Sequence, residues 1–341
     1  MGNTSTASMQ DVAREAGVSP QTVSRVANGS NAVRPETRRK VEAAMDKLGY
    51  RPNYAARALK HGKFHGKFKD IGVVMFNMTT FGNARILNGI AAAANDNGYA
   101  TTVQSIGRGR ERTLQAAIER MKQLPVDGVV VVMEERVPDF DEFQPPQDLP
   151  VVLISEDPAN HCPTIDADQY GCSTAIVDYL LSKGHRTVYH IAGPSSSRAA
   201  ESRAQGWRDA LEQMGIPVPP TYVGDWEADS GYQAGLSLAR DPGCTAIYAA
   251  NDQMAYGAML GLRAGGKRVP EDVSVVGVDD SLVGMVPRLN LTTMRMKFTE
   301  IGREAFSIVK RICEGERIPS GVKTVIPPEF IERGSVRDIA R

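Results

Sequence analysis

Five polar residues near the N-terminus have a spacing suited to contacting DNA bases. In the stretch VSPQTVSRVANG, Gln21, Arg25 and Asn28 share one face of a helix that turns about 100° per residue, and Thr22 and Ser24 flank that face. Gln pairs bidentately with adenine and Arg with guanine across the major groove. The spacing therefore predicts a helix that reads base edges, with a solvated amphipathic helix as the alternative.

A second set of residues follows apolar runs that are typical of buried strands. Arg203 lies shortly after IAGPSSS, Trp226 ends YVGDW, Asn251 follows TAIYAA and Asp279 follows VSVVGV. An indole covers an apolar sugar face, while Asp, Asn and Arg bind hydroxyls, so this set suits a carbohydrate. The structural alternatives are a core role for Trp226 and a helix-capping role for the neighbouring Asp252.

Three short helices are predicted to position the first set. The first covers residues 9–16 and ends at Gly17, the second starts at Pro20, and the third follows Pro35. The valines of the second helix lie opposite its polar face, so they are expected to pack against the neighbouring helices. A helix, a tight glycine turn and a second helix with outward polar residues form a helix-turn-helix.

The two parts of the chain differ in charge although the net charge is zero. Residues 1–69 hold 13 Lys/Arg against 5 Asp/Glu, and the remainder holds 27 against 35. A basic headpiece on an acidic body is typical of a nucleic-acid module joined to another domain. Residues 50–69 have the composition of a linker with one short conditional helix.

From residue 70 onward, short Val/Ile-rich strands alternate with amphipathic segments. Such alternation predicts parallel sheets covered by helices on both faces. The pattern runs past 200 residues, which is too long for one sheet, so we expect two Rossmann-like α/β lobes with a cleft between them.

No sequence motif meets the requirements of a catalytic, cofactor or metal site. GLRAGGK at residues 261–267 resembles a phosphate loop, but Arg268 replaces its Ser/Thr and the motif ends a helix. GRG at Gly107 lacks the third glycine of a dinucleotide site, and His61 and His65 lie in a Gly/Lys-rich linker without further ligands. We therefore expect no enzyme, no cofactor and no metal site.

Composition further limits the compartment and the partners. No apolar run approaches the roughly 18–20 residues that span a bilayer, and the first residues lack a secretory signal pattern. The four cysteines show no C-x-x-C spacing. A cytoplasmic protein with reduced thiols and no membrane contact is expected.

The segments MQDVAREAGVSPQTVSRVANG and VRPETRRKVEAAMDKLGYRPNYAARAL resemble the headpiece of the lactose-repressor (LacI/GalR) family of bacterial transcription regulators. The resemblance covers nearly the whole chain, because the family core has two lobes like those of periplasmic sugar-binding proteins. It implies a headpiece at residues 1–49, a hinge linker at 50–69 and a core at 70–341. The N-terminal lobe would comprise residues 70–166 and 294–325, and the C-terminal lobe residues 167–293 and 326–341.

The resemblance also assigns roles to DNA-binding residues. Pro20, Gln21 and Arg25 match positions that read bases, although the member that names the family has an aromatic residue in place of Pro20. Positions that contact phosphate or support the fold are matched by Thr22, Ser24 and Asn28. Minor-groove positions of the family's hinge helix are matched by Ala56 and Leu59, with the leucine as a wedge. Leu59 alone would fit helix packing equally well.

SRAQGW, GDW, ANDQMAYGAM and SVVGVDD match the effector pocket of sugar-responsive members at Arg203, Trp226, Asn251 and Asp279. The resemblance adds further lining positions from the N-terminal lobe and the crossover segments. These are Phe81, Asn83, Ile86, Ser155, Met296 and Phe298. Ser155 stands in place of an acidic residue and Met296 in place of a glutamine, so the identity of the sugar is open.

Together, these features predict a homodimeric DNA-binding repressor that a small carbohydrate, glycoside or galactoside-like, releases from its operator. The dimer is expected because the C-terminal residues contain no leucine heptad for tetramer formation. One alternative is a regulator that requires a purine or a phosphorylated co-repressor. The other is a sugar-binding transport protein, against which residues 1–60 argue.

Overall fold

The computed structural model describes residues 7–27, 32–50, 68–106, 112–159 and 161–340. Two compact units divide the chain at residues 68 and 69, a headpiece and a core. No helix in these ranges is long and apolar enough to cross a membrane.

The described residues of the headpiece form three helices around a small apolar core. They are α1 (Met9–Ala16), α2 (Pro20–Ala27) and α3 (Pro35–Lys47). Ser8 and Asp11 form a reciprocal capping box at the start of α1, and Gly17 ends α1 with a φ of 64°. Val12, Val23 and Val41 are fully buried, one from each helix, so α2 packs through its valines as expected.

The described residues of the core form two six-stranded sheets with the same doubly wound plan. The strand order of the first sheet is β11-β5-β4-β3-β1-β2 and that of the second is β12-β10-β9-β8-β6-β7. Every pairing is parallel except β10 with β12. The expected α/β core of two Rossmann-like lobes is therefore confirmed.

The N-terminal lobe carries helices on both faces of its sheet. Its strands are β1 (Asp70–Met75), β2 (Ala100–Ser105), β3 (Gly128–Val132), β4 (Val151–Ile154), β5 (Thr164–Ala167) and β11 (Lys323–Ile326). Its helices are α5 (Phe81–Asp96), α6 (Leu114–Lys122) and α11 (Phe298–Cys313). Val73 packs with the core toward α5 and α11, while Val74 packs toward α6, so consecutive strand residues are all apolar.

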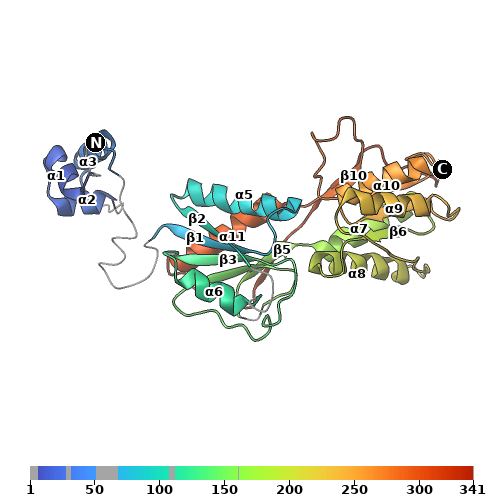
Figure 1. Cartoon of the computed structure of the whole chain (residues 1–341), viewed down its shortest axis with the longest axis horizontal. Helices are drawn as coiled ribbons and strands as arrows, with labels where there is room; N and C mark the ends of the chain where they lie inside the picture. Colours follow the sequence, from blue (N-terminus) through green and yellow to red (C-terminus); the bar gives the residue numbers. More distant parts are fainter. Residues whose placement is uncertain (1–6, 28–31, 51–67, 107–111, 160, 341) are drawn as a thin grey trace, which may run out of the picture. The chain divides into compact units, whose positions relative to one another are not determined.

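The C-terminal lobe repeats the arrangement. Its strands are β6 (Tyr189–Ala192), β7 (Tyr222–Val223), β8 (Ala246–Ala249), β9 (Ser274–Val278), β10 (Thr292–Arg295) and β12 (Glu329–Ile331). Its helices are α7 (Gln169–Ser182), α8 (Arg198–Gln213), α9 (Ala228–Leu238) and α10 (Asp252–Ala264). Helices α9 and α10 cover one face, while α7 and α8 cover the other (Figure 1).

The boundaries between the lobes differ from the expected ones. The expected change at 293/294 falls inside β10, which pairs wholly with the C-terminal lobe through β9 and β12. The expected change at 325/326 falls inside β11, whose Ile326 still pairs with Ala167. The chain therefore changes lobe just after each strand, because a strand pairs as a unit.

Helices α5 and α11 approach each other closely through two glycines. A Cβ on Gly302 would lie 2.2 Å from the Ile86 carbonyl oxygen, and one on Gly89 would lie 2.3 Å from the Thr299 carbonyl oxygen. Both obstacles are backbone atoms that cannot rotate away, so only glycine allows this helix spacing.

We expect Gly302→Ala to lower the free energy of unfolding by about 1–3 kcal/mol, because the added methyl forces α5 and α11 apart. Urea denaturation of the full chain measures the change. Arg303→Ala is the control, since this neighbouring side chain is half exposed and pairs only at the surface with Asp96. Equal stability of Gly302→Ala and the wild type would contradict the close approach.

Candidate ligand cavity and candidate nucleic-acid interface

A cavity of about 390 Å³ lies where the carboxyl ends of the strands of both sheets meet. This volume falls within the range of small-molecule sites, and open α/β sheets bind ligands at this edge. Eight of the predicted ligand residues line it, four from each lobe. They are Phe81, Asn83, Ile86, Phe298, Arg203, Trp226, Asn251 and Asp279.

Arg203 organises the wall formed by the C-terminal lobe. Its side chain is almost fully buried; Nε donates to the side-chain oxygen of Gln169 at 2.8 Å, and Nη1 donates to the Ala250 carbonyl. Its Nη2 lies 3.7 Å from Oδ1 of Asp279. Burial raises the pKa of Asp279 to about 7, and the positive charge of Arg203 opposes this shift. Oδ1 of Asp279 has no hydrogen-bond partner in the structure, so it can accept one from a ligand.

Trp226 packs against this wall through its backbone carbonyl and through Gly193, which has no side chain to displace the indole. Its carbonyl accepts a hydrogen bond from Nδ2 of Asn251 at 2.9 Å, and its φ is 75°, in the left-handed region. A Cβ on Gly193 would lie 2.3 Å from the indole. Non-glycine residues adopt a positive φ only at an energetic cost, and residues strained in this way are common at functional sites. Asp279, with a φ of 105°, is a second case beside it.

Asn251, not Asp252, caps α10, which corrects the capping alternative. Oδ1 of Asn251 accepts from the backbone N–H of Met254 at 2.9 Å. Asp252 instead accepts hydrogen bonds from the Thr293 hydroxyl at 2.6 Å and from the backbone N–H of Ser281 at 2.8 Å. Asn251 thus both starts α10 and orients Trp226.

The N-terminal lobe contributes an apolar corner. The rings of Phe81 and Phe298 meet edge to face, with centroids 6.3 Å apart and an angle of 71°. Asn83 is buried and donates to the Asn77 carbonyl at 2.7 Å, so one of its amide hydrogens is already committed.

Two predicted ligand residues do not line this cavity. Ser155 is buried, and its hydroxyl accepts a hydrogen bond from the backbone N–H of Asp157 at 3.2 Å. Met296 is buried beside an adjoining hollow of about 370 Å³ that also includes Arg295 and Lys297 and shares Phe81, Asp279 and Phe298 with the cavity. For Ser155 the reason is strand alternation, since Ile154 and Glu156 line the cavity while the residue between them points away.

Several carboxylates that were not predicted from the sequence also line the cavity. They are Glu134, Glu156, Asp166, Asp225 and Glu227. Glu134 and Glu156 follow β3 and β4 by two residues, so the strand-end argument that located Asn251 and Asp279 could have found them. Burial raises the pKa of Glu134, and it raises the pKa of Asp166 to about 7 with a further contribution from Glu156.

The candidate nucleic-acid interface is the outer face of α2. Pro20, Gln21 and Arg25 are exposed there, and Thr22 and Ser24 are half-buried. The Thr22 hydroxyl lies 3.0 Å from that of Ser19, whose oxygen also accepts the Thr22 backbone N–H at 3.2 Å. The predicted DNA-contacting residues Asn28, Ala56 and Leu59 lie outside the described residues.

Comparison with known proteins identifies the family of the headpiece and the domain type of the core. Residues 8–53 match the family model of bacterial regulatory proteins of the lacI family, and residues 177–336 match that of the periplasmic binding protein-like domain. The transcriptional repressor CytR of Escherichia coli K12 is 30% identical, covering 97% of this chain and 96% of its own. The chain belongs to the lacI family.

Other members of the lacI family are also similar to this chain over nearly its whole length. The transcriptional repressor PurR of Haemophilus influenzae is 29% identical over 98% of this chain and 99% of its own. A lac repressor dimer bound to operator and the anti-inducer ONPF superposes with a TM-score of 0.79, at 28% identity over 98% of this chain and all of its own. A complex of the regulator CelR with cellobiose gives a TM-score of 0.65, at 29% identity over 96% of this chain and 99% of its own.

As a member of the lacI family, the chain is a DNA-binding transcriptional repressor and not an enzyme. The predicted family is thereby confirmed, and the transport-protein alternative is set aside.

The Asp166→Asn variant tests whether Asp166 is buried in the cavity wall, because burial of this carboxylate makes the free energy of unfolding depend on pH. The native state binds this proton more tightly than the unfolded chain, because the pKa rises from 3.8 to about 7 on folding. The stabilisation from Asp166 is therefore present at low pH and lost as the pH rises toward 7. Between pH 5 and pH 8, we expect the wild type to lose about 1–3 kcal/mol of unfolding free energy relative to Asp166→Asn.

Urea denaturation of the full chain at pH 5, 6.5 and 8 measures this difference. Asp148→Asn, at an exposed carboxylate, should keep the pH dependence of the wild type. Parallel curves for the wild type and Asp166→Asn would show that the carboxylate is not desolvated.

Proposed function

We propose that this lacI-family repressor binds a neutral saccharide in the inter-lobe cavity and that this saccharide releases it from its operator. The observation that carries the proposal is the charge of the cavity wall. Six carboxylate residues line it, against two arginines, among the residues that the structure describes. Carboxylates accept hydrogen bonds, so the ligand must supply donors, as the hydroxyls of a sugar do.

Neither arginine is available to neutralise an anion. Arg203 is buried beside Asp279, and Arg198 pairs with Asp157 and Glu201. Burial raises the pKa of Asp166 and Asp279 to about 7, so part of this wall is neutral near pH 7. A phosphate would still meet the remaining carboxylates without a free guanidinium, which is costly at low dielectric. The cavity therefore argues against the phosphorylated co-repressor.

Trp226 supplies the apolar surface that a pyranose ring requires beside these acceptors. The Cζ of Arg203 lies 5.8 Å from the centroid of the indole ring, and both side chains line the cavity. A purine remains the second candidate, since PurR is among the relatives. However, the edge-to-face rings of Phe81 and Phe298 do not form a parallel slot for a planar base.

On the DNA side, α2 would enter the major groove with Gln21 and Arg25 toward the bases. A homodimer would place two headpieces on a pseudo-palindromic operator, with half-sites about one helical turn apart. The hinge residues Ala56 and Leu59 would enter the minor groove between them, with Leu59 as an apolar wedge. The lac repressor dimer on its operator supports this arrangement, and a protein that binds DNA in this way would act in the cytoplasm.

The effector assignment is tested by operator binding in a gel shift across neutral mono- and disaccharides, their phosphates, and purines. We expect a neutral saccharide to release the operator, and Trp226→Ala to weaken that response at least about tenfold while operator binding persists. Fluorescence in a Trp207→Phe background reports Trp226 alone, because the chain has two tryptophans. Release or strengthening by a purine, with no sugar effective, would overturn the saccharide.

Arg25→Ala tests the base-reading role of α2. Loss of a bidentate base contact should cost about 1–3 kcal/mol of operator affinity and relax the preference at one base position. Binding to randomised operators at fixed salt measures both quantities. Arg14→Ala on α1 is the control, as another exposed arginine outside the proposed reading face, and should leave base preference unchanged. An unaltered preference in Arg25→Ala would remove the assignment.

A further inference from the structure

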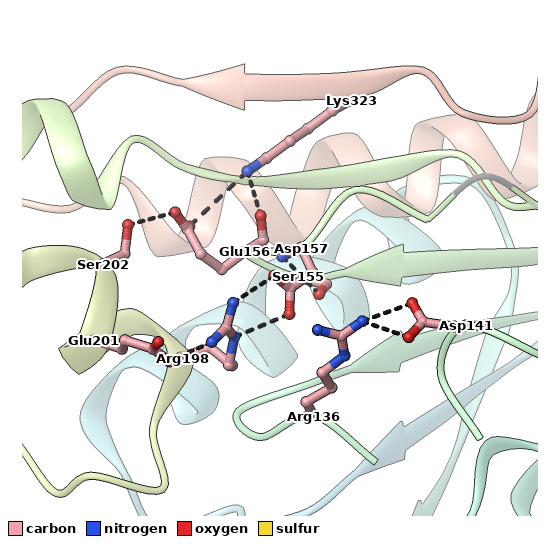
Figure 2. A network of polar contacts seen from close by, with 9 residues as sticks. All are labelled: Arg136, Asp141, Ser155, Glu156, Asp157, Arg198, Glu201, Ser202 and Lys323. Carbon is pink, nitrogen blue, oxygen red and sulfur yellow. Dashed lines mark hydrogen bonds and ion pairs between the residues drawn. The ribbon is translucent and has the colours of Figure 1, made fainter. Parts of the chain in front are cut away.

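The first turns of α8 are bonded to the opposite lobe beside the cavity (Figure 2). Arg198 is the first residue of this helix, and Asp157 lies three residues beyond β4 in the N-terminal lobe. The guanidinium makes two bonds to the carboxylate, Nε to Oδ2 at 2.9 Å and Nη2 to Oδ1 at 2.6 Å. Two parallel bonds fix the direction of approach as well as the distance.

A second contact lies one helical turn further along α8. The Ser202 hydroxyl donates to Oε1 of Glu156 at 2.7 Å. Residues four apart face the same side of a helix, so Arg198 and Ser202 address consecutive residues of the other lobe. In addition, the backbone N–H of Arg198 donates to the Glu134 carbonyl at 3.1 Å, beyond the end of β3.

Both sides of the contact are held in place by neighbours in their own lobe. In the N-terminal lobe, Ser155 accepts the Asp157 backbone N–H, and Nζ of Lys323 donates to the Glu156 carbonyl at 2.5 Å. In the C-terminal lobe, Glu201 pairs with Arg198. These supports lower the entropy lost when the long side chains are ordered, which is the usual weakness of an ion pair.

We propose that Arg198–Asp157 and Ser202–Glu156 form an inter-lobe latch that holds the cleft closed before any ligand binds. Arg198 and Glu156 also line the cavity, so the latch is part of its wall. Opening the cleft for ligand entry breaks three hydrogen bonds between side chains and the backbone bond to Glu134. The latch therefore sets the ratio of closed to open cleft in the free protein.

The latch differs from an incidental surface pair. The side chains of Arg198 and Asp157 are 30% and 19% exposed, so solvent screens the pair only partly. Arg136 and Asp141 provide the contrast in Figure 2, because they are 46% and 73% exposed and both belong to the N-terminal lobe. An equally short ion pair within one lobe cannot respond to cleft opening.

The experiment measures the distance between the lobes in the full chain without ligand. Spin labels at Leu124→Cys in the N-terminal lobe and Met214→Cys in the C-terminal lobe report it by pulsed electron paramagnetic resonance. Both positions are exposed, whereas the four native cysteines are buried. We expect Arg198→Ala and Asp157→Ala each to lower the closed-to-open ratio about fivefold, and the double variant to add little.

Three further measurements separate the latch from general loss of structure. Arg136→Ala should keep the wild-type distances, and Arg198→Lys should retain part of the closed population because it keeps the charge without the paired bonds. Raising the salt concentration should open the wild type more than Arg198→Ala. Circular dichroism checks folding, and Ser202→Ala offers a milder second variant if an alanine replacement of the ion pair unfolds the chain.

Unchanged distances in Arg198→Ala and Asp157→Ala, or in Ser202→Ala where it replaces them, would overturn the latch. An equal shift in Arg136→Ala would do the same. No effector enters this experiment, so its outcome is independent of the saccharide assignment.

Discussion

The ligand cavity depends on one buried charge, the guanidinium of Arg203. Water cannot solvate it, so the protein supplies Gln169, the Ala250 carbonyl and Asp279 from three different segments of the C-terminal lobe. Removing one partner of such a buried pair typically costs about 3–5 kcal/mol, because a charge is left uncompensated. The start of α7, the end of β8 and the end of β9 are consequently fixed relative to one another, and the cavity wall is rigid before a ligand arrives.

Helix and strand positions were largely predictable because burial imposes a short sequence period. The headpiece helix at residues 9–16 agrees with α1 at both ends, where a capping serine and a left-handed glycine mark the boundaries. Helix α9 forms although its sequence, ADSGYQAGLSL, carries glycines that lower helix propensity. Those glycines permit close packing: a Cβ on Gly235 would lie 2.3 Å from the Ala258 carbonyl of α10. Tertiary packing therefore overrides local propensity there.

Position after a strand predicted part of the polar wall of the site. Asn251 follows β8 by two residues and Asp279 follows β9 by one, and the structure places both in the cavity. Ser155 was a one-residue error, since the adjacent Glu156 is the lining residue. Side chains alternate along extended chain, so a shift of one residue exchanges the two faces. Arg198 was missed for another reason: its partner Asp157 is 41 residues away, and no local pattern links them.

The contacts of Arg203 stabilise one lobe, whereas the latch controls the opening of the cleft between the lobes. The Arg203 contacts lie within one lobe and are almost fully buried, so no ligand of ordinary affinity repays their loss. Arg198 and Asp157 join the two lobes and keep partial access to solvent, which lowers the cost of separating them to about 1 kcal/mol. Allosteric coupling between sites is typically about 1–3 kcal/mol, so a ligand needs only modest preference for one cleft arrangement to reset the latch. Because the Arg203 wall is rigid and the latch between the lobes is weak, ligand binding can change the angle between the lobes without unfolding either one.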